Sequence, residues 1–100
     1  MYLVRIEHRV PSFEGWRRAF DSDPVGRQRS GVRGYRVMRP VDDRAYAMID
    51  LEFDTQAEAE TMLRSLRDLW SRVDGQVMSD AQARIVETVE SMELARGETA

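Results

Sequence analysis

The 100-residue sequence contains no cysteine, no lysine and no asparagine, and its single histidine is His8. Without cysteine the chain can form no disulfide, no thiolate nucleophile and no thiolate metal site. Without lysine it has neither a Schiff-base residue nor the lysine of a phosphate-binding loop. One histidine cannot supply the two or three of common zinc and non-haem iron sites, although two copies of His8 could meet across a dimer axis. We therefore expect no metal and no cofactor.

Long apolar runs and a basic charge balance are also missing. No apolar run approaches the roughly 20 residues that cross a bilayer, so no membrane partner is expected. The segment Tyr2–Val10 carries arginine and glutamate where a signal peptide would be apolar, which predicts a cytoplasmic location. All fifteen basic residues are arginine, yet the net charge is −3 and the pI about 5.2. This balance argues against a nucleic-acid partner, which needs a basic face.

Four segments are predicted strands because apolar side chains alternate in them or β-branched residues gather there. They are Tyr2–Val10, Val32–Arg39, Ala45–Phe53 and Ala83–Val89. The middle two form a hairpin through the turn Pro40–Arg44. A five-residue turn puts Tyr35 and Val37 on the apolar face, whereas a slip of one residue would exchange the faces.

Two helices are predicted from apolar stripes at helical spacing. The first covers Phe13–Asp21 and is capped by Ser12, which follows a proline. The second begins after Thr55, which is spaced to form a capping box with Glu58, and continues to Val73. Its apolar residues recur every three or four positions, which is typical of a helix that faces a core.

The elements follow one another as strand, helix, strand, strand, helix, strand. At this length the order packs most simply as an α+β fold, the ferredoxin-like β-α-β-β-α-β arrangement, with a four-stranded antiparallel sheet and two helices on one face. We expect residues 1–90 to form a single domain and residues 91–100 to be a tail that forms a short helix or is disordered. A chain this short buries only about two-thirds of its unfolded surface, so dimerisation would add stability.

The block from GVRGYRVMRP to DLEFDT, together with the element order and the length, resembles the dimeric α/β-barrel superfamily. This superfamily of ferredoxin-like domains includes antibiotic-biosynthesis-monooxygenase-like proteins, haem-degrading monooxygenases, muconolactone isomerases and uncharacterised members. The resemblance implies a homodimer with its sheets face to face and a pocket between helices and sheet. Trp70 resembles in position the tryptophan that the second helix places in that pocket. Haem degraders pair it with an asparagine and a histidine ligand; this chain has no asparagine and only His8.

Four residues are candidates for a pocket between helices and sheet. His8 is the only side chain whose unperturbed pKa lies near neutrality, so it is the candidate catalytic base or hydrogen-bonding residue. The alternative is a histidine at the edge of the core. Trp16, Tyr35 and Trp70 are expected to form the walls of a cavity for a flat aromatic ligand, with ordinary core packing as the alternative.

Charged residues suggest two further surfaces. Arg27, Arg29 and Arg33 cluster in a loop, where they either receive a carboxylate or phosphate or form solvated pairs with Asp21 or Asp23. The sheet face turned away from the helices mixes charged and apolar side chains, and we predict that it is the dimer interface. The residues assigned to this interface are Arg5, Arg36, Tyr46, Met48, Asp50 and Glu52. Asp50 and Glu52 are expected to pair with Arg5, Arg36 or Arg84 and not to act as catalytic carboxylates.

The sequence thus favours a small homodimeric domain of uncharacterised function. Our leading hypothesis is binding, or transformation without a cofactor, of a small aromatic or polyketide-like molecule in the pocket between helices and sheet. An enzymatic version would have a monooxygenase-like, isomerase-like or cyclase-like activity without metal. The alternatives are a non-catalytic dimerisation module and a stress-related or regulatory protein of the same fold.

Overall fold

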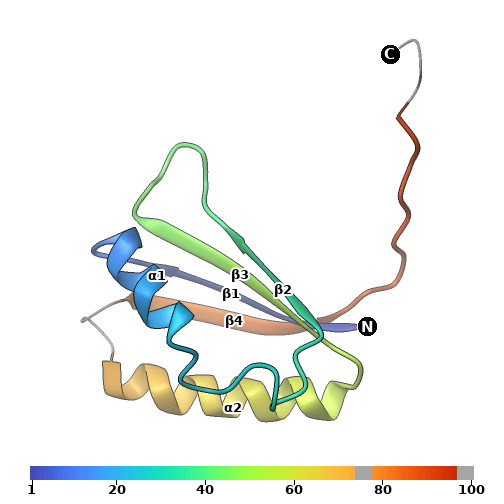
Figure 1. The fold of residues 1–100 in the computed structure, drawn as a ribbon, viewed down its shortest axis with the longest axis horizontal. Coiled ribbons are helices and arrows are strands. Elements are labelled where there is room, and N and C mark those ends of the chain that lie inside the picture. The colour runs from blue at the N-terminus through green and yellow to red at the C-terminus, as the bar shows by residue number, and fades with distance from the viewer. Residues whose placement is uncertain (74–77, 97–100) are drawn as a thin grey trace.

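The computed structural model describes residues 1–73 and 78–96 of the chain. Its elements, drawn in Figure 1, are β1 (Tyr2–Arg9), α1 (Phe13–Asp21), β2 (Gly34–Met38), β3 (Tyr46–Phe53), α2 (Gln56–Val73) and β4 (Ser79–Glu87). This order confirms the predicted β-α-β-β-α-β arrangement of the α+β, ferredoxin-like fold. Within the described residues, no helix is both long enough and apolar enough to cross a membrane.

The four strands form one antiparallel sheet in the order β2-β3-β1-β4. In β1, Val4 pairs with Leu51 of β3 and with Ile85 of β4. Paired residues point to the same side of the sheet, so their side chains form rows across the strands. The sheet therefore has two distinct faces. The covered face, which lies under the helices, includes Val4, Ile6, His8, Val37, Ala47, Ile49, Leu51, Phe53 and Ile85. The open face includes Leu3, Arg5, Glu7, Arg36, Met38, Tyr46, Met48, Asp50, Glu52, Arg84 and Val86.

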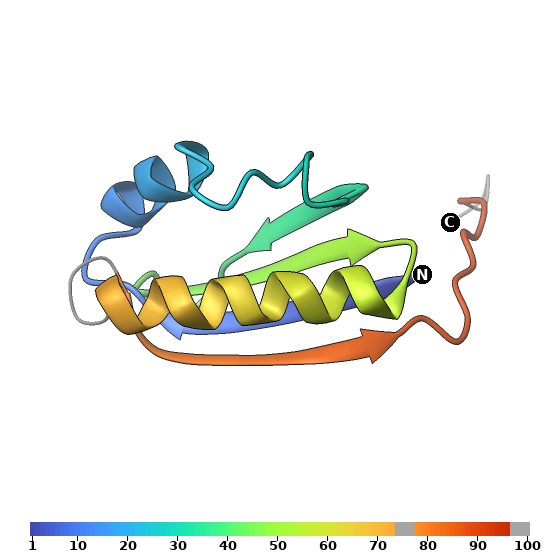
Figure 2. The same ribbon diagram turned by 90° about the horizontal axis from the view of Figure 1, so that it is seen from below.

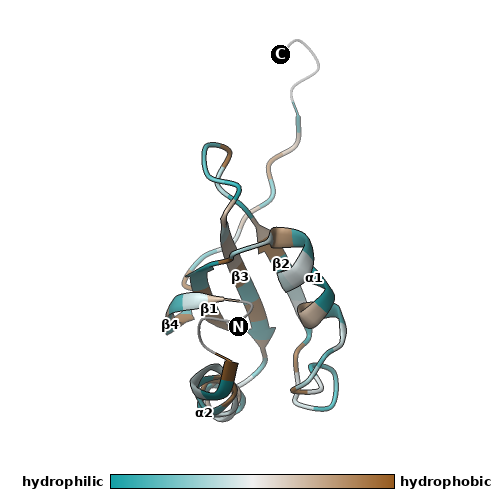
Figure 3. Ribbon diagram, turned by 90° about the vertical axis from the view of Figure 1, so that its left-hand side faces the viewer, coloured by the Kyte–Doolittle hydropathy of each residue, from teal (hydrophilic) through white to brown (hydrophobic). Residues whose placement is uncertain are grey.

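Both helices begin as the sequence predicts. The Ser12 hydroxyl accepts a hydrogen bond from the Gly15 backbone N–H at 3.1 Å, which satisfies a free donor of the first turn of α1. In α2 the Glu58 N–H donates to the Thr55 hydroxyl at 3.2 Å, and that hydroxyl donates to the Glu58 carboxylate at 3.0 Å. α2 packs against β1, β3 and β4, while α1 lies beside β2 (Figure 3).

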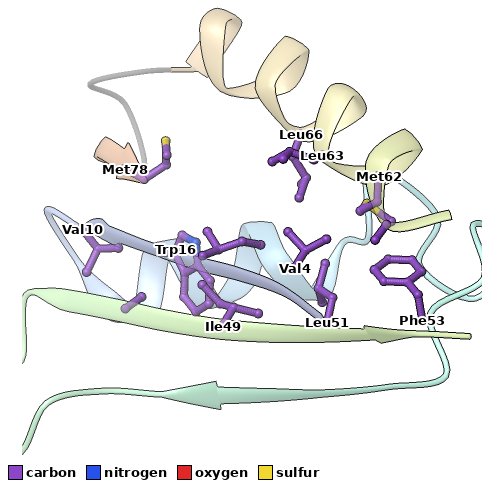
Figure 4. Packing of buried hydrophobic residues seen from close by; sticks show 13 residues of the cluster. Val4, Val10, Trp16, Ile49, Leu51, Phe53, Met62, Leu63, Leu66 and Met78 are labelled. Carbon is purple, nitrogen blue, oxygen red and sulfur yellow. The ribbon is translucent and has the colours of Figure 1, made fainter. Parts of the chain in front are cut away.

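The core lies between α2 and the covered face. Figure 4 shows Met62, Leu63 and Leu66 of α2 turned toward the sheet, where Val4 and Phe53 face them. All five side chains are buried. Since burying one such side chain contributes about 1.5–3 kcal/mol, this layer supplies most of the driving force for folding.

The hairpin and the last strand differ from their predicted bounds. The connection between β2 and β3 comprises residues 39–45, two more than the predicted turn Pro40–Arg44. Because that difference is even, Tyr35 and Val37 still point to the apolar face of the sheet, as they would with a five-residue turn. β4 begins at Ser79 instead of Ala83 and ends at Glu87 instead of Val89. Its polar start pairs with β1 through backbone hydrogen bonds, which leave little trace in the hydrophobic pattern.

Residues 88–96, called the C-terminal arm below, leave the sheet after β4 without forming a helix or a strand (Figures 1 and 2). The short helix that was one alternative for residues 91–100 is therefore not formed over 91–96, and residues 97–100 lie outside the described part. The radius of gyration is 15.1 Å. A compact domain of this length has about 13 Å, and Figure 1 shows the arm extending away from the sheet.

Candidate functional site

A cavity of about 100 Å³ lies between the two helices and the covered face of the sheet. We call it the helix-sheet cavity. Its walls come from all parts of the fold: Ile6, His8, Ile49 and Leu51 from the sheet, Trp16, Ala19 and Phe20 from α1, Leu66, Leu69, Trp70 and Val73 from α2, and Pro24, Val25, Arg27 and Met78 from connecting segments. Of these side chains only His8 and Arg27 ionise near neutral pH or carry charge, so the cavity is mostly apolar with two polar positions.

His8 is buried in the wall of this cavity, with 2% of its surface exposed. Its place follows from the alternation of β1, which turns Val4, Ile6 and His8 to the covered face. The ring meets Trp16 edge to face with centroids 5.5 Å apart. Burial, the dominant influence, lowers the pKa of His8 below its ordinary value of 6.5, because an imidazolium loses its hydration there. The neutral imidazole is thus the form present at neutral pH.

The two ring nitrogens of His8 have different surroundings. Nδ1 lies 3.3 Å from the backbone oxygen of Arg9 and donates to it in the Nδ1–H tautomer. Every side-chain nitrogen or oxygen shielded from solvent in the described residues has a hydrogen-bond partner, and this bond through Nδ1 is the side-chain hydrogen bond that His8 makes. No hydrogen bond to Nε2 is found within the described residues, so in the Nδ1–H tautomer its lone pair is available as an acceptor in a residue that lines the cavity.

A β-bulge in β4 lies directly opposite His8. Glu7 pairs with Gln82 and Arg9 with Ser79, so β4 contains one more residue than β1 between these pairs. Asp80, inside the bulge, has φ 57°, a left-handed conformation that aspartate adopts more readily than most residues. His8 consequently has a partner in β3, Ala47, but none in β4. Bulges of this kind are frequent beside functional sites, where they redirect strands and side chains.

The structure brings three of the four predicted pocket residues together. His8, Trp16 and Trp70 all line the helix-sheet cavity. Tyr35 does not, because Phe20 lies between: the rings of Trp16 and Phe20 stack with centroids 5.2 Å apart, and Tyr35 meets the far edge of Phe20 at 5.3 Å. Tyr35 lies on the edge strand β2 and remains 48% exposed.

Arg27 is a cavity residue that sequence reasoning did not identify. Its Nη1 donates to the backbone oxygen of Phe20 at 2.8 Å, and its guanidinium lies 3.9 Å from the centre of the Phe20 ring. The predicted partner Asp23 is present at 3.6 Å, but the Arg27 side chain is only 15% exposed and is therefore not a solvated loop charge. The neighbouring Arg33 pairs with Asp54 at 3.5 Å, a partner that the sequence pattern did not suggest.

The six predicted interface residues all lie on the open face. Arg5 forms two hydrogen bonds of 3.0 Å to the two carboxylate oxygens of Asp50, and this contact raises the pKa of Arg5. The Tyr46 hydroxyl donates to Glu7 at 2.6 Å, which raises the pKa of Tyr46. Met48 and Glu52 flank these pairs and are partly exposed. The face is hollowed, with a volume of about 410 Å³ above Met38, Met48 and the residues around them.

Four residues of the open face, the arginine row, lie side by side across the sheet. Arg36 is opposite Asp50, Asp50 is opposite Arg5, and Arg5 is opposite Arg84. One carboxylate therefore faces three guanidinium groups. Arg36 and Arg84 make no ion pair with any residue that the structure describes.

Comparison with solved structures shows that this fold recurs. A protein from Deinococcus radiodurans provisionally described as an antibiotic biosynthesis monooxygenase superposes with a TM-score of 0.63 over 96% of this chain and 100% of its own, at 14% identity. The haem degrader MhuD from Mycobacterium tuberculosis, with two haems bound in its active site, gives 0.55 over 91% and 99%, at 15% identity. A dimeric ferredoxin-like protein from an uncultured marine organism gives 0.62 over 94% and 100%, at 7% identity.

Sequence comparisons add no relative: no family model matches the chain, and no curated protein sequence matches it. At these low identities the structural likeness shows the fold alone. The chain thus has the ferredoxin-like fold shared by antibiotic biosynthesis monooxygenase-like and dimeric ferredoxin-like proteins.

Proposed function

We propose that two copies of this chain associate through their open faces and that each copy binds a small, mainly apolar molecule in its helix-sheet cavity. The observation that carries the proposal is the chemistry of that cavity. Apolar side chains form nearly all of its wall, and the neutral imidazole of His8, whose Nδ1 contacts the Arg9 backbone oxygen, is one of the few polar groups in it. Ligand sites in proteins combine an apolar lining with a few polar groups in the same way.

The size of the cavity limits the ligand. Its volume is about 100 Å³. An engineered apolar cavity of about 150 Å³ binds benzene, and sites for drug-sized ligands measure roughly 300–1,000 Å³. A single aromatic ring therefore fits after a modest shift of the wall, for which the partly exposed Trp70 and Phe20 are the natural candidates. A two-ring molecule requires much more rearrangement.

The residues of the cavity do not fit haem, the ligand of the structural neighbour MhuD. The space is too small, and His8, the only histidine, is 2% exposed beneath Trp16. An iron ligand must reach the macrocycle through open space, which this position does not offer. We therefore assign no haem chemistry to the chain.

The two polar groups define what the cavity can do chemically. A neutral imidazole can accept a hydrogen bond from a phenol or take its proton, and the positive charge of Arg27 in the same wall stabilises the resulting phenolate. Binding requires only the first step. Turnover in addition requires that this proton be transferred to the imidazole.

Association through the open face is supported by its composition and shape. In one copy this face leaves partly exposed apolar groups, among them Leu3, Met48 and Val86, beside both signs of charge. Three arginines and three carboxylates lie on it, so a second copy can pair opposite charges and does not simply repel. Two structural neighbours are described as dimeric ferredoxin-like proteins.

Tryptophan fluorescence tests the ligand proposal directly, because the chain has two tryptophans and both line the cavity. Phenol and toluene form a matched pair, since they share a shape and differ in the hydroxyl group. We expect both to change the emission saturably. Replacing His8→Leu is expected to weaken phenol binding roughly 5- to 10-fold, the value of one lost hydrogen bond, while toluene binding stays unchanged.

Two controls separate the outcomes. Ser65→Ala, on the exposed outer side of α2, should leave both affinities unchanged. The two-ring probe 1-naphthol should bind more weakly than phenol if the cavity sets the size limit. The absence of a saturable signal with every probe contradicts the ligand proposal, and an equal loss of phenol and toluene affinity in His8→Leu contradicts the role of Nε2.

A non-catalytic dimerisation module is the second candidate function, and the small volume of the cavity favours it. In that case the aromatic side chains around His8 serve only to pack the core. The same titrations then give no binding, while sedimentation equilibrium still gives a dimer.

A further inference from the structure

The C-terminal arm exposes apolar side chains that its own chain does not cover. Val89, Met92 and Leu94 are 91%, 73% and 86% exposed. They are half of the large hydrophobic residues that are exposed in the described part of the chain. Apolar groups gathered on one short segment cost free energy in water and commonly mark a contact surface.

The backbone of the arm is equally unpartnered. The Thr88 N–H donates to the Met1 oxygen at 2.9 Å, which continues the pairing of β4 beside β1. Beyond Thr88, no backbone hydrogen bond to another described residue is made by residues 89–96. An extended segment with free N–H and C=O groups can add to the edge of another sheet.

The direction of the arm indicates what it meets. In Figures 1 and 3, α2 lies on one side of the sheet and the arm rises on the other, the side of the open face. At the opposite end of the sheet the connection between β2 and β3 rises on that side too, and its Val41 is fully exposed. The hollow of about 410 Å³ on the open face thus lies between two projecting segments.

The charges of the arm complement those of the open face. Glu90 and Glu93 lie among the exposed apolar residues of the arm. On the open face, Arg36 and Arg84 at the two ends of the arginine row have no ion-pair partner among the described residues. A second copy therefore offers two guanidinium groups for two carboxylates, along with apolar surface for the side chains between them.

We propose that the C-terminal arms are exchanged between two copies of this chain, so that each arm packs Val89, Met92 and Leu94 onto the other copy. The inference rests on the homodimer proposed above. Nine extended residues span about 30 Å, enough to cross from one copy to the body of the other.

The first test compares the full chain with two truncations, residues 1–96 and residues 1–87, by sedimentation equilibrium. The 1–96 form is the matched control and should dimerise like the full chain. Removing the arm in 1–87 should raise the dimer dissociation constant about 100-fold or more, since burying one such side chain is worth about tenfold in association. An unchanged constant for 1–87 overturns arm exchange and leaves the homodimer in place. A full chain that stays monomeric at all concentrations overturns both.

A second test shows where the arm lies. Because the chain has no cysteine, Leu94→Cys provides a unique site for a benzophenone crosslinker. Equal amounts of isotope-labelled and unlabelled protein are mixed, irradiated and digested. Arm exchange predicts crosslinked peptides that join a labelled to an unlabelled chain, whereas the matched site Ser65→Cys on the outer side of α2 should give none. Crosslinks confined to single chains would show that the arm folds back on its own copy.

Discussion

The two faces of the sheet are built from the same strands, yet they differ in nearly every physical property. On the covered face of β3, Ala47, Ile49, Leu51 and Phe53 are all buried. On its open face the alternate residues are partly exposed except Asp50, which Arg5 holds in place. The alternation of apolar and polar residues along the strand therefore produces two different surfaces. One drives folding within a single copy, and the other is available for association.

The largest expected effect on stability comes from comparing two methionines, one in the core against the covered face and one on the open face. Met62 of α2 is 1% exposed in the core, so Met62→Ala should lower the free energy of unfolding by about 2–5 kcal/mol. Met48, on the open face, is only partly buried in one copy, and Met48→Ala should cost less than about 1 kcal/mol in the monomer. Urea denaturation at low protein concentration measures both. Equal costs would mean that the two faces do not differ in this way.

Reversing one charge of the arginine row is expected to act on association more than on folding. Asp50→Arg places four arginines in line across the open face. We expect the dissociation constant of the proposed dimer to rise about 100-fold, because like charges are then forced together between the copies. Asp50→Asn should have a smaller effect, and Glu60→Arg, on the exposed side of α2, should have none. Circular dichroism verifies that each variant folds.

The pH dependence of stability distinguishes the covered face through His8. Burial lowers the pKa of His8, so below pH 6.5 the unfolded chain binds this proton more readily than the folded chain. The stability contributed by the neutral imidazole is therefore present above pH 6.5 and is lost as the pH falls toward the lowered folded-state pKa. Unfolding of the wild type and of His8→Leu, compared between about pH 7.5 and about pH 5.5, should show the wild type losing more stability. Parallel curves would indicate that His8 titrates normally.

The smallest effect is expected from Tyr46→Phe on the open face. This change removes the 2.6 Å hydrogen bond to Glu7 and should cost about 0.5–1.5 kcal/mol. The same bond raises the pKa of Tyr46, because the neutral hydroxyl donates this hydrogen bond to Glu7 and the phenolate cannot. Ultraviolet titration of the tyrosines should lose a late-titrating group in the variant. An unchanged titration curve would place Tyr46 outside this contact.

The sequence was sufficient for features that depend on local pattern. Ser12 caps α1, the box of Thr55 and Glu58 starts α2, and the alternation of β3 separates the two faces. Each of these depends on residues that are close in the chain, where spacing alone determines geometry. The side of the sheet to which Tyr35 and Val37 point was predicted for the same reason, because it depends only on whether the number of connecting residues is odd or even.

Features that depend on distant partners were less accessible. The polar start of β4 is a strand because β1 lies beside it, and the bulge at Asp80 interrupts any pattern that could reveal this. In the sequence Arg27 resembles a surface charge, whereas in the structure its guanidinium lies over the rings of Phe20 and Tyr35. Tyr35 has the expected facing, but its place on the edge strand separates it from the cavity behind Phe20. In each case the missing information is which segment packs against which.

The strand order β2-β3-β1-β4 has a consequence for how the chain acquires its structure during synthesis. β1 is made first but lies in the middle of the sheet, and its neighbour β4 is made about 70 residues later. Until β4 has left the ribosome, one edge of β1 has no strand beside it, and α2 can pack only against β1 and β3. The nascent chain therefore stays open along that edge until β4 has been made, and during this interval the edge is exposed to chaperones and to wrong partners.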